Sequence, residues 1–83
     1  MPFLVAGAPQ LGDVLRGLRK ARKLTQVDVA RASGMLQKTV SMLEINPSRC
    51  SVDSLMRYIA AVDGRVLLDL DSDEGAKLAG SHW

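Results

Sequence analysis

The sequence between residues 25 and 45 has the spacing of two short helices that cross at a tight turn. Ala30 is small enough to let two helices approach closely. Gly34, four residues later, accepts the positive φ that such a turn needs. Val40 and Leu43 follow at helical spacing and can seat the second helix on a core. The pattern predicts two helices, one from Thr25 to Gly34 and one from about Gln37 to Ile45.

The signals at the ends of these two helices are uneven. The Thr25 hydroxyl can accept the amide of Asp28 while the Asp28 carboxylate reaches back to Thr25, which makes a short-armed capping box. At the second helix the usual Ser or Thr cap is replaced by Leu36, a change that costs about 1 kcal/mol. Pro47 disfavours the α region at Asn46, so this helix should end there.

Further elements are predicted on both sides of this pair. An amphipathic helix is predicted from Gln10 to Lys23 by the helical spacing of Leu11, Val14, Leu15 and Leu18, although Gly12 and Gly17 weaken it. A second amphipathic helix, capped by Ser51, is predicted by the spacing of Leu55, Met56, Ile59 and Val62. Residues 65–70 have the pattern of one short strand. Because a lone strand has no partner in a helical chain, we expect it to pair with the same strand of a second copy.

Charge is distributed unevenly although the net charge is only +2. Residues 16–38 hold seven Lys and Arg against Asp28, which gives +6, whereas residues 63–74 hold five acids against Arg65, which gives −4. The basic stretch can face a polyanion such as DNA. The alternative interpretation is that both runs are ordinary solvated faces.

Length and composition restrict the class of protein. The chain has 83 residues, 47% of them apolar, with one Cys and one His. A core of this size is marginal by itself, so we expect a partner subunit. No apolar run is long enough to span a membrane and no secretory signal is recognisable, which predicts a cytoplasmic protein. No nucleophile–base pair, phosphate loop or metal-ligand group is visible, so we predict no enzyme activity, cofactor or metal.

The spacing over residues 26–45 is that of a helix-turn-helix, whose second helix enters the major groove of DNA. The segment LTQVDVARASGMLQKTVSMLE resembles the helix-turn-helix of the Cro/C1 repressor (XRE) family, and the similarity covers about residues 10–62. The chain also resembles HipB-like antitoxins in the order of its segments: QKTVSMLE, a Pro-containing loop, an amphipathic helix, a short strand and a small polar tail that ends in Trp.

This resemblance implies a mainly α fold. It is a lambda-repressor-like helix-turn-helix bundle of four to five helices, with one short C-terminal strand that pairs across a homodimer. We expect an extended segment over residues 1–9, a DNA-binding and dimerisation domain over 10–71 and a flexible tail over 72–83. The implied function is repression at palindromic operators upstream of the protein's own genes, in the nucleoid, and binding of a HipA-like Ser/Thr kinase toxin. The alternative is a solitary XRE-type regulator with no toxin.

The resemblance also assigns roles to residues. Base contacts are expected from Gln37, Lys38, Thr39 and Ser41, and phosphate contacts from Lys23, Thr25 and Gln26. The apolar pattern of the last helix and the strand, rather than the resemblance, predicts dimer contacts from Ile59, Val66, Leu68 and Leu70. Met42 neighbours Ser41, which is the better polar candidate. Arg19 and Glu44 occupy positions that form a structural ion pair in related phage repressors, so neither is expected to contact DNA.

Three remaining residues have a structural and a functional interpretation. Trp83 is either an incidental chain-end residue or an anchor in a pocket of the partner kinase, since Trp is a frequent binding hot spot. Cys50 is expected to be a small, partly buried loop residue rather than a redox switch. Val27 is apolar where the family is usually polar, so it leaves an apolar side chain on the outer face of its helix.

Overall fold

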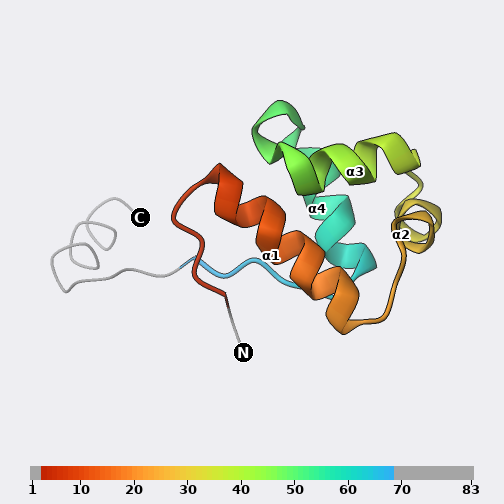
Figure 1. The fold of residues 1–83 in the computed structure, drawn as a ribbon, viewed down its shortest axis with the longest axis horizontal. Coiled ribbons are helices and arrows are strands. Elements are labelled where there is room, and N and C mark those ends of the chain that lie inside the picture. The colour runs from red at the N-terminus through yellow and green to blue at the C-terminus, as the bar shows by residue number, and fades with distance from the viewer. Residues whose placement is uncertain (1–2, 69–83) are drawn as a thin grey trace, which may run out of the picture.

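The computed structural model describes residues 3–68. Within them the chain forms α1 (Ala8–Ala21), α2 (Gln26–Ser33), α3 (Gln37–Ile45), the 3-10 helix η1 (Pro47–Arg49) and α4 (Val52–Ala61) (Figure 1). The predicted mainly helical bundle is confirmed. The leading residues 1–2 and the predicted tail over 72–83, with Trp83, lie outside the described residues.

Helix α1 begins and ends two residues earlier than predicted. It starts at Ala8, so Pro9 lies in its first turn rather than at the end of an extended segment. Proline fits there because the first amides of a helix have no partner within the helix. The helix ends at Ala21 because Lys23 adopts a left-handed conformation with φ of 57°.

The predicted ends of α2 and α3 are confirmed. The Thr25 hydroxyl accepts from the Asp28 amide at 3.1 Å, and Asp28 Oδ2 accepts from the Thr25 amide at 2.8 Å. Gly34 ends α2 with φ of 72°. Helix α3 starts after Leu36 without a side-chain cap and stops at Asn46, directly before Pro47.

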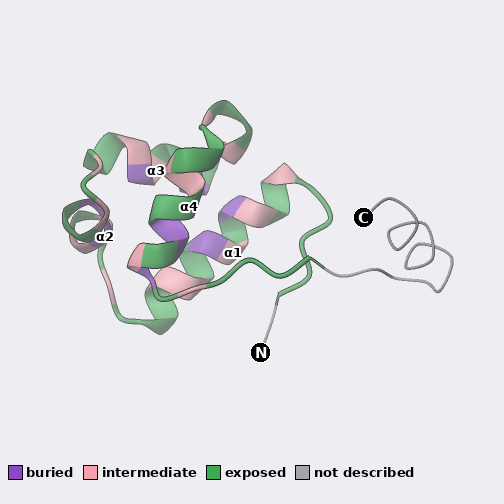
Figure 2. Ribbon diagram, turned by 180° about the vertical axis from the view of Figure 1, so that it is seen from behind, coloured by how far each residue is buried: buried purple, intermediate pink, exposed green. Residues whose placement is uncertain are grey.

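The core is formed by apolar side chains from all four α-helices, which Figure 2 shows as the buried, inward faces. Its buried members are Leu15, Val29, Ala30, Val40, Leu43, Tyr58, Ile59 and Val62. Helix α4 packs against α2 and α3; it lies behind α1 and α3 in Figure 1 and in front of them in Figure 2. The arrangement buries one face of α3 and leaves the opposite face of that helix on the outside of the bundle.

Gly12 marks the closest approach between α1 and α3. A Cβ atom at this position would overlap the carbonyl oxygen of Glu44 and would lie 3.4 Å from the Pro47 ring. Gly17, on the exposed side of the same helix, has nothing within 4 Å of the equivalent position. Both glycines lower the helix propensity of α1, but only Gly12 is required by the packing.

The segment after α4 differs from the prediction. The chain leaves α4 through Asp63, with φ of 58°, and Gly64, and residues 65–68 then run without regular secondary structure. Val66, Leu67 and Leu68 are all exposed, so no face of this segment is buried by the chain itself. Within residues 3–68 no strand lies beside residues 65–68, so the predicted strand is not formed in this part of the chain; Leu70 lies outside the described residues.

Candidate nucleic-acid interface

Helix α3 presents the first two predicted base-contacting residues to solvent. Gln37 and Lys38 are exposed at its N-terminal end, whereas Thr39 and Ser41 are half-buried. The opposite face is completely covered, because Val40 and Leu43 belong to the core. The helix is therefore held by one face and has its N-terminal end accessible, as a recognition helix requires.

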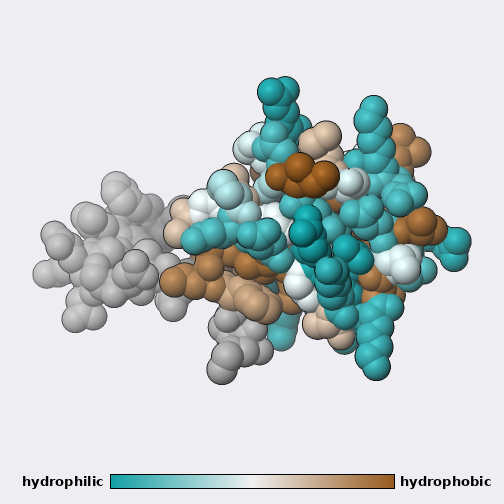
Figure 3. Space-filling view, viewed as in Figure 1, coloured by the Kyte–Doolittle hydropathy of each residue, from teal (hydrophilic) through white to brown (hydrophobic). Residues whose placement is uncertain are grey.

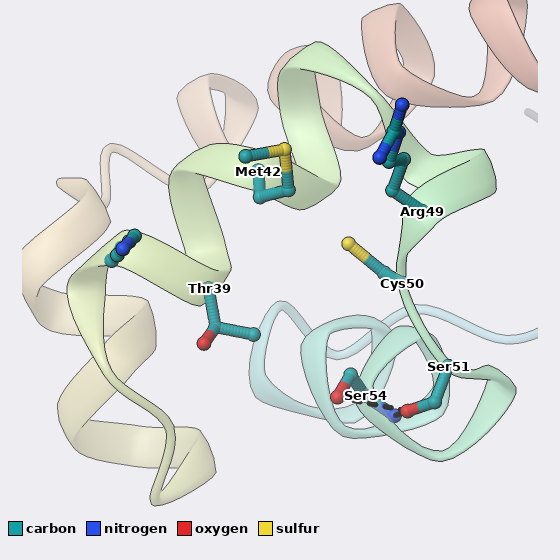
Figure 4. A pocket seen from close by; sticks show the side chains of 7 residues that line it. Thr39, Met42, Arg49, Cys50, Ser51 and Ser54 are labelled. Carbon is teal, nitrogen blue, oxygen red and sulfur yellow. Dashed lines mark hydrogen bonds between the residues drawn. The ribbon is translucent and has the colours of Figure 1, made fainter.

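A shallow groove of about 320 Å³ separates α3 from the start of α4. Figure 4 shows that Thr39 points across this groove toward Ser54, rather than straight out from the bundle. The groove is lined by Lys38, Thr39, Met42, Arg49, Cys50, Ser51 and Ser54. Cys50 is half-buried, which confirms its predicted place as a partly buried loop residue.

Arg49 is a cation of this surface that the sequence did not single out. It lies in η1, eleven positions after Lys38 in the chain, yet both residues line the same groove. The turn of the chain at Pro47 brings them together. In the sequence Arg49 stands in a short loop outside the main basic stretch, so no pattern linked it to α3.

One buried carboxylate, that of Glu44, connects α3 to the other three α-helices. Glu44 Oε2 accepts from Arg19 Nε of α1 at 2.7 Å, and Oε1 accepts from Arg19 Nη2 at 3.0 Å. Gln26 Nε2 of α2 donates to Oε1 at 3.2 Å, and the Tyr58 hydroxyl of α4 donates to Oε2 at 2.6 Å. Arg16 Nε lies 3.5 Å from Oε1. We call Arg19, Gln26, Glu44 and Tyr58 the Glu44 network.

The network keeps Glu44 ionised although its side chain is only 1% exposed. Burial raises the pKa of Glu44, but the hydrogen bonds from Arg19, Tyr58 and Gln26 outweigh it, and the net pKa lies below the ordinary value of 4.5. The hydrogen bond to Glu44 raises the pKa of Arg19. Burial, with the hydrogen bond to Glu44, raises the pKa of the Tyr58 hydroxyl far above its ordinary value.

The Arg19–Glu44 ion pair is confirmed, and the other two partners extend it. Gln26 was predicted to contact phosphate; in the structure its side-chain amide is half-buried and bound to Glu44. Tyr58 was not predicted to have a role beyond the helix it occupies. Tyr58 stands next to Ile59 of the apolar stripe of α4, and nothing in the sequence signals that its hydroxyl reaches a carboxylate 14 residues away.

Lys23 and Thr25, the other two predicted phosphate contacts, are exposed in the link between α1 and α2. The Thr25 hydroxyl caps α2, and the carboxylate of Asp28 lies beside it. The hydrogen bonds from Thr25 lower the pKa of Asp28, so this end of α2 carries a negative charge at neutral pH. The bond between Gln26 and Glu44 places the same end of α2 next to α3.

Part of the basic stretch is paired with acidic side chains of the same chain. Arg19 and Arg16 approach Glu44, and Arg22 pairs with Asp63 from the acidic stretch. The exposed basic residues that take no part in the ion pairs of the described chain are Arg65, in the segment after α4, and Lys20, Lys23, Arg31, Lys38 and Arg49. The surface of α3 and its surroundings therefore remains basic.

The predicted dimer residues lie in two different environments. Ile59 is buried in the core of its own chain, while Val66 and Leu68 are exposed. The N-terminal residues Phe3 and Leu4 are exposed as well. Apolar colour gathers in Figure 3 on the side where these two end segments run in Figure 1.

None of the helices within residues 3–68 combines the length and the apolar character needed to cross a membrane.

Comparisons with known proteins place this geometry in a family. The helix-turn-helix family matches residues 15–64. Antitoxin HigA1 of Mycobacterium tuberculosis, in two strains, is 44% identical over 64 residues, which is 77% of this chain and 43% of the relative. The chain thus spans less than half the length of the curated relatives it matches.

Solved structures with the same fold come from HipB complexes. A chain in the structure of a HipA–HipB–O2–O3 complex superimposes with a TM-score of 0.80 at 20% identity, covering 86% of this chain and 100% of that one. A chain in a complex of a HipB variant with an O2 20mer gives 0.80 at 19% identity, covering 87% and 100%. The likeness shows that this chain shares the mainly helical, helix-turn-helix fold of those chains.

Proposed function

Because the chain belongs to the helix-turn-helix family of the Cro/C1 (XRE) type, we propose that it is a sequence-specific transcriptional repressor that also serves as an antitoxin. The observation that carries the proposal is the state of α3. Its inner face is fixed by Val40, Leu43 and the Glu44 network, and its N-terminal end, with Gln37 and Lys38, is open to solvent. A rigid helix with exposed hydrogen-bonding groups at its N-terminal end is what major-groove reading needs.

The proposed base contacts follow from the chemistry of the exposed side chains. Gln37 can pair with the N6 and N7 groups of adenine, and Lys38 can donate to O6 or N7 of guanine. Thr39 and Ser41, on the flanks of the helix, can bond a base edge or a phosphate. Lys23 and Thr25 would contact phosphates directly, and Gln26 would do so through its backbone amide, since its side chain is bound to Glu44.

We propose that the repressor is a homodimer joined through residues 66–70. Val66 and Leu68 are exposed apolar residues, and no strand among residues 3–68 pairs with their segment, which supports pairing with the same segment of a second copy. Leu70 would continue the strand. Ile59 is covered by its own chain, so it would support the interface from within the core of each copy. Two recognition helices related by a two-fold axis would read half-sites about 10 bp apart.

The antitoxin role is supported by the sequence relationship to Antitoxin HigA1. As the toxin we propose a HipA-like kinase, with Trp83 as an anchor residue. A chain truncated after Asp71 should keep DNA affinity and lose affinity for the kinase, measured by calorimetry with purified components. Loss of operator binding by a folded, truncated dimer would contradict the division into two binding ends.

The DNA-binding role is tested with Lys38→Ala and a matched control, Arg57→Ala. Both variants remove one exposed cation, but Arg57 lies on α4 and pairs with Asp53 at 2.9 Å. On a duplex enriched by the wild-type protein from random DNA, loss of one base contact of about 1–3 kcal/mol should weaken binding about 5- to 150-fold for Lys38→Ala. Arg57→Ala should stay within twofold. Equal behaviour of the two variants would refute the reading role of α3.

A further inference from the structure

The outermost face of α3 is partly apolar. The buried residues of α3 are Val40, Leu43 and Glu44. At about 100° of rotation per residue, the side of the helix opposite to them holds Lys38, Met42 and Ile45. Met42 is 37% exposed and Ile45 is 68% exposed. One cation and two apolar side chains therefore form the stripe that α3 turns away from the core, and we call it the α3 stripe.

The two apolar members of the α3 stripe contribute little to the core of the chain. Leu43, between them in sequence, is fully buried, so α3 already has its core contact. An apolar side chain on a surface that faces DNA has a specific use. In the major groove the C5 methyl group of thymine is the one apolar group that the four bases present, and apolar side chains contact it.

The position of Met42 suits such a contact. It lies four residues after Lys38, about 6 Å further along the helix axis, which is close to the rise of two base pairs. Figure 4 shows Met42 beside the groove between α3 and α4, with Arg49 and Cys50 on the far side. The unbranched thioether can adjust its shape to a methyl group, and the cations Lys38 and Arg49 flank the site where a phosphate backbone would run.

We propose that Met42 is a specificity-determining residue that recognises the methyl group of a thymine in each half-site, about two base pairs from the base contacted by Lys38. The inference rests on the proposed DNA-binding function and deepens it, because it names the chemical group that one residue reads. Ile45 serves as the natural control. It belongs to the same stripe but lies about 10 Å beyond Lys38 along the axis, whereas the N-terminal residues of a recognition helix are those that reach base edges.

The test replaces single thymines by deoxyuridine in the duplex that the wild-type protein enriches from random DNA. This change removes the methyl group and leaves every hydrogen-bonding group of the base in place. The wild-type protein should lose about fourfold in affinity at one position per half-site, the equivalent of about 0.8 kcal/mol for one buried methyl-sized group. Substitutions at the other thymines should change affinity by less than twofold.

Two variants assign the effect to the residue. Met42→Ala should bind the thymine and uracil duplexes equally well, while Ile45→Ala should keep the fourfold difference; circular dichroism checks that both remain folded. A wild-type protein indifferent to every uracil substitution, an enriched half-site without thymine, or a Met42→Ala variant that still discriminates would each overturn the proposal. Enrichment of no sequence at all would instead count against the proposed DNA-binding function.

Discussion

Replacing Arg19 by alanine should destabilise the protein far more than a surface substitution. The side chain of Glu44 is 1% exposed, and Arg19 supplies two of the four hydrogen bonds that it receives. Removing one partner of a buried ion pair costs about 3–5 kcal/mol, because the other charge stays buried. Arg16 lies 3.5 Å from Glu44 and can take over part of the role, so we expect the lower end, about 3 kcal/mol.

Urea unfolding followed by circular dichroism measures this loss. A loss of 3 kcal/mol corresponds to a decrease in Tm of about 12–24 °C for a domain of this size. Protein concentration has to be held constant, because dimerisation stabilises by mass action. The control is Arg57→Ala, which removes the exposed pair with Asp53 and should cost about 0.3–0.5 kcal/mol. If Arg19→Ala costs no more than this control, the Glu44 network does not hold the bundle together.

The dependence of this loss on pH gives a second check. In the wild-type protein the pKa of Glu44 lies below 4.5, so the carboxylate stabilises the fold above that pH and its contribution is lost as the pH falls through the folded-state pKa. Without Arg19, burial becomes dominant and raises the pKa of Glu44 above its ordinary value. The variant then gains from protonation in acid. The difference in free energy of unfolding between the two proteins should therefore narrow from pH 7 to pH 4, and a constant difference would contradict the assignment.

Three further predictions concern stability. Gly12→Ala should destabilise the protein by at least about 2 kcal/mol because its Cβ would overlap the Glu44 carbonyl oxygen. Gly17→Ala has open space around its Cβ and should stabilise the protein by about 0.5–1 kcal/mol. Thermal unfolding measures both, and a shift of the two Tm values in the same direction would contradict the account. Tyr58→Phe should lower the free energy of unfolding in urea by about 1.5–3 kcal/mol, because it removes the hydrogen bond to Glu44. Burial raises the pKa of the Tyr58 hydroxyl, so the stability of the wild-type protein should be constant below pH 10 and fall as the pH rises further. The variant should not show this fall. Leu36→Ser should stabilise α3 by about 1 kcal/mol, and no change in Tm would show that the exposed start of α3 gains nothing from a cap.

Local signals in the sequence were sufficient for the helix-turn-helix. Thr25 with Asp28, Gly34 and Pro47 each act through the conformation of a few neighbouring residues, so the ends of α2 and α3 follow from chemistry that any reader of the sequence can apply. Ser51 caps α4 in the same way, accepting from the Ser54 amide at 3.0 Å. The ion pair of Arg19 with Glu44 came from the resemblance to known repressors, since nothing in the spacing alone connects residues 25 positions apart.

Features that depend on how helices cross could not be predicted. In the sequence Gly12 only lowers the helix propensity of α1; the need for a small residue there becomes visible when α3 packs against it. Nothing in the sequence gives Tyr58 a role beyond its helix, and only the packed structure places its hydroxyl 2.6 Å from Glu44. Arg49 joins the surface of α3 only because the chain turns at Pro47. Each of these depends on tertiary packing, which no local periodicity encodes.

The candidate interface was predicted in outline and altered in detail. Gln37 and Lys38 are exposed as expected, but the helical phase set by Val40 and Leu43 turns Thr39 toward α4 and Met42 outward. By polarity alone, the sequence favours Ser41 over Met42 as a base-contacting residue. The Glu44 network fixes the orientation of α3 in the bundle, and in that orientation Met42 is exposed while Ser41 is half-buried.

Selection of bound sequences from a random pool of double-stranded DNA, with the purified protein alone, tests the central claim most directly. The account predicts a palindrome whose half-sites are centred about 10 bp, or a multiple of that, apart, because two copies of α3 must enter major grooves on one side of the duplex. Affinity for that duplex should fall steeply with salt. Enrichment of no sequence, from a protein shown to be folded and dimeric, would contradict the claim that α3 reads DNA.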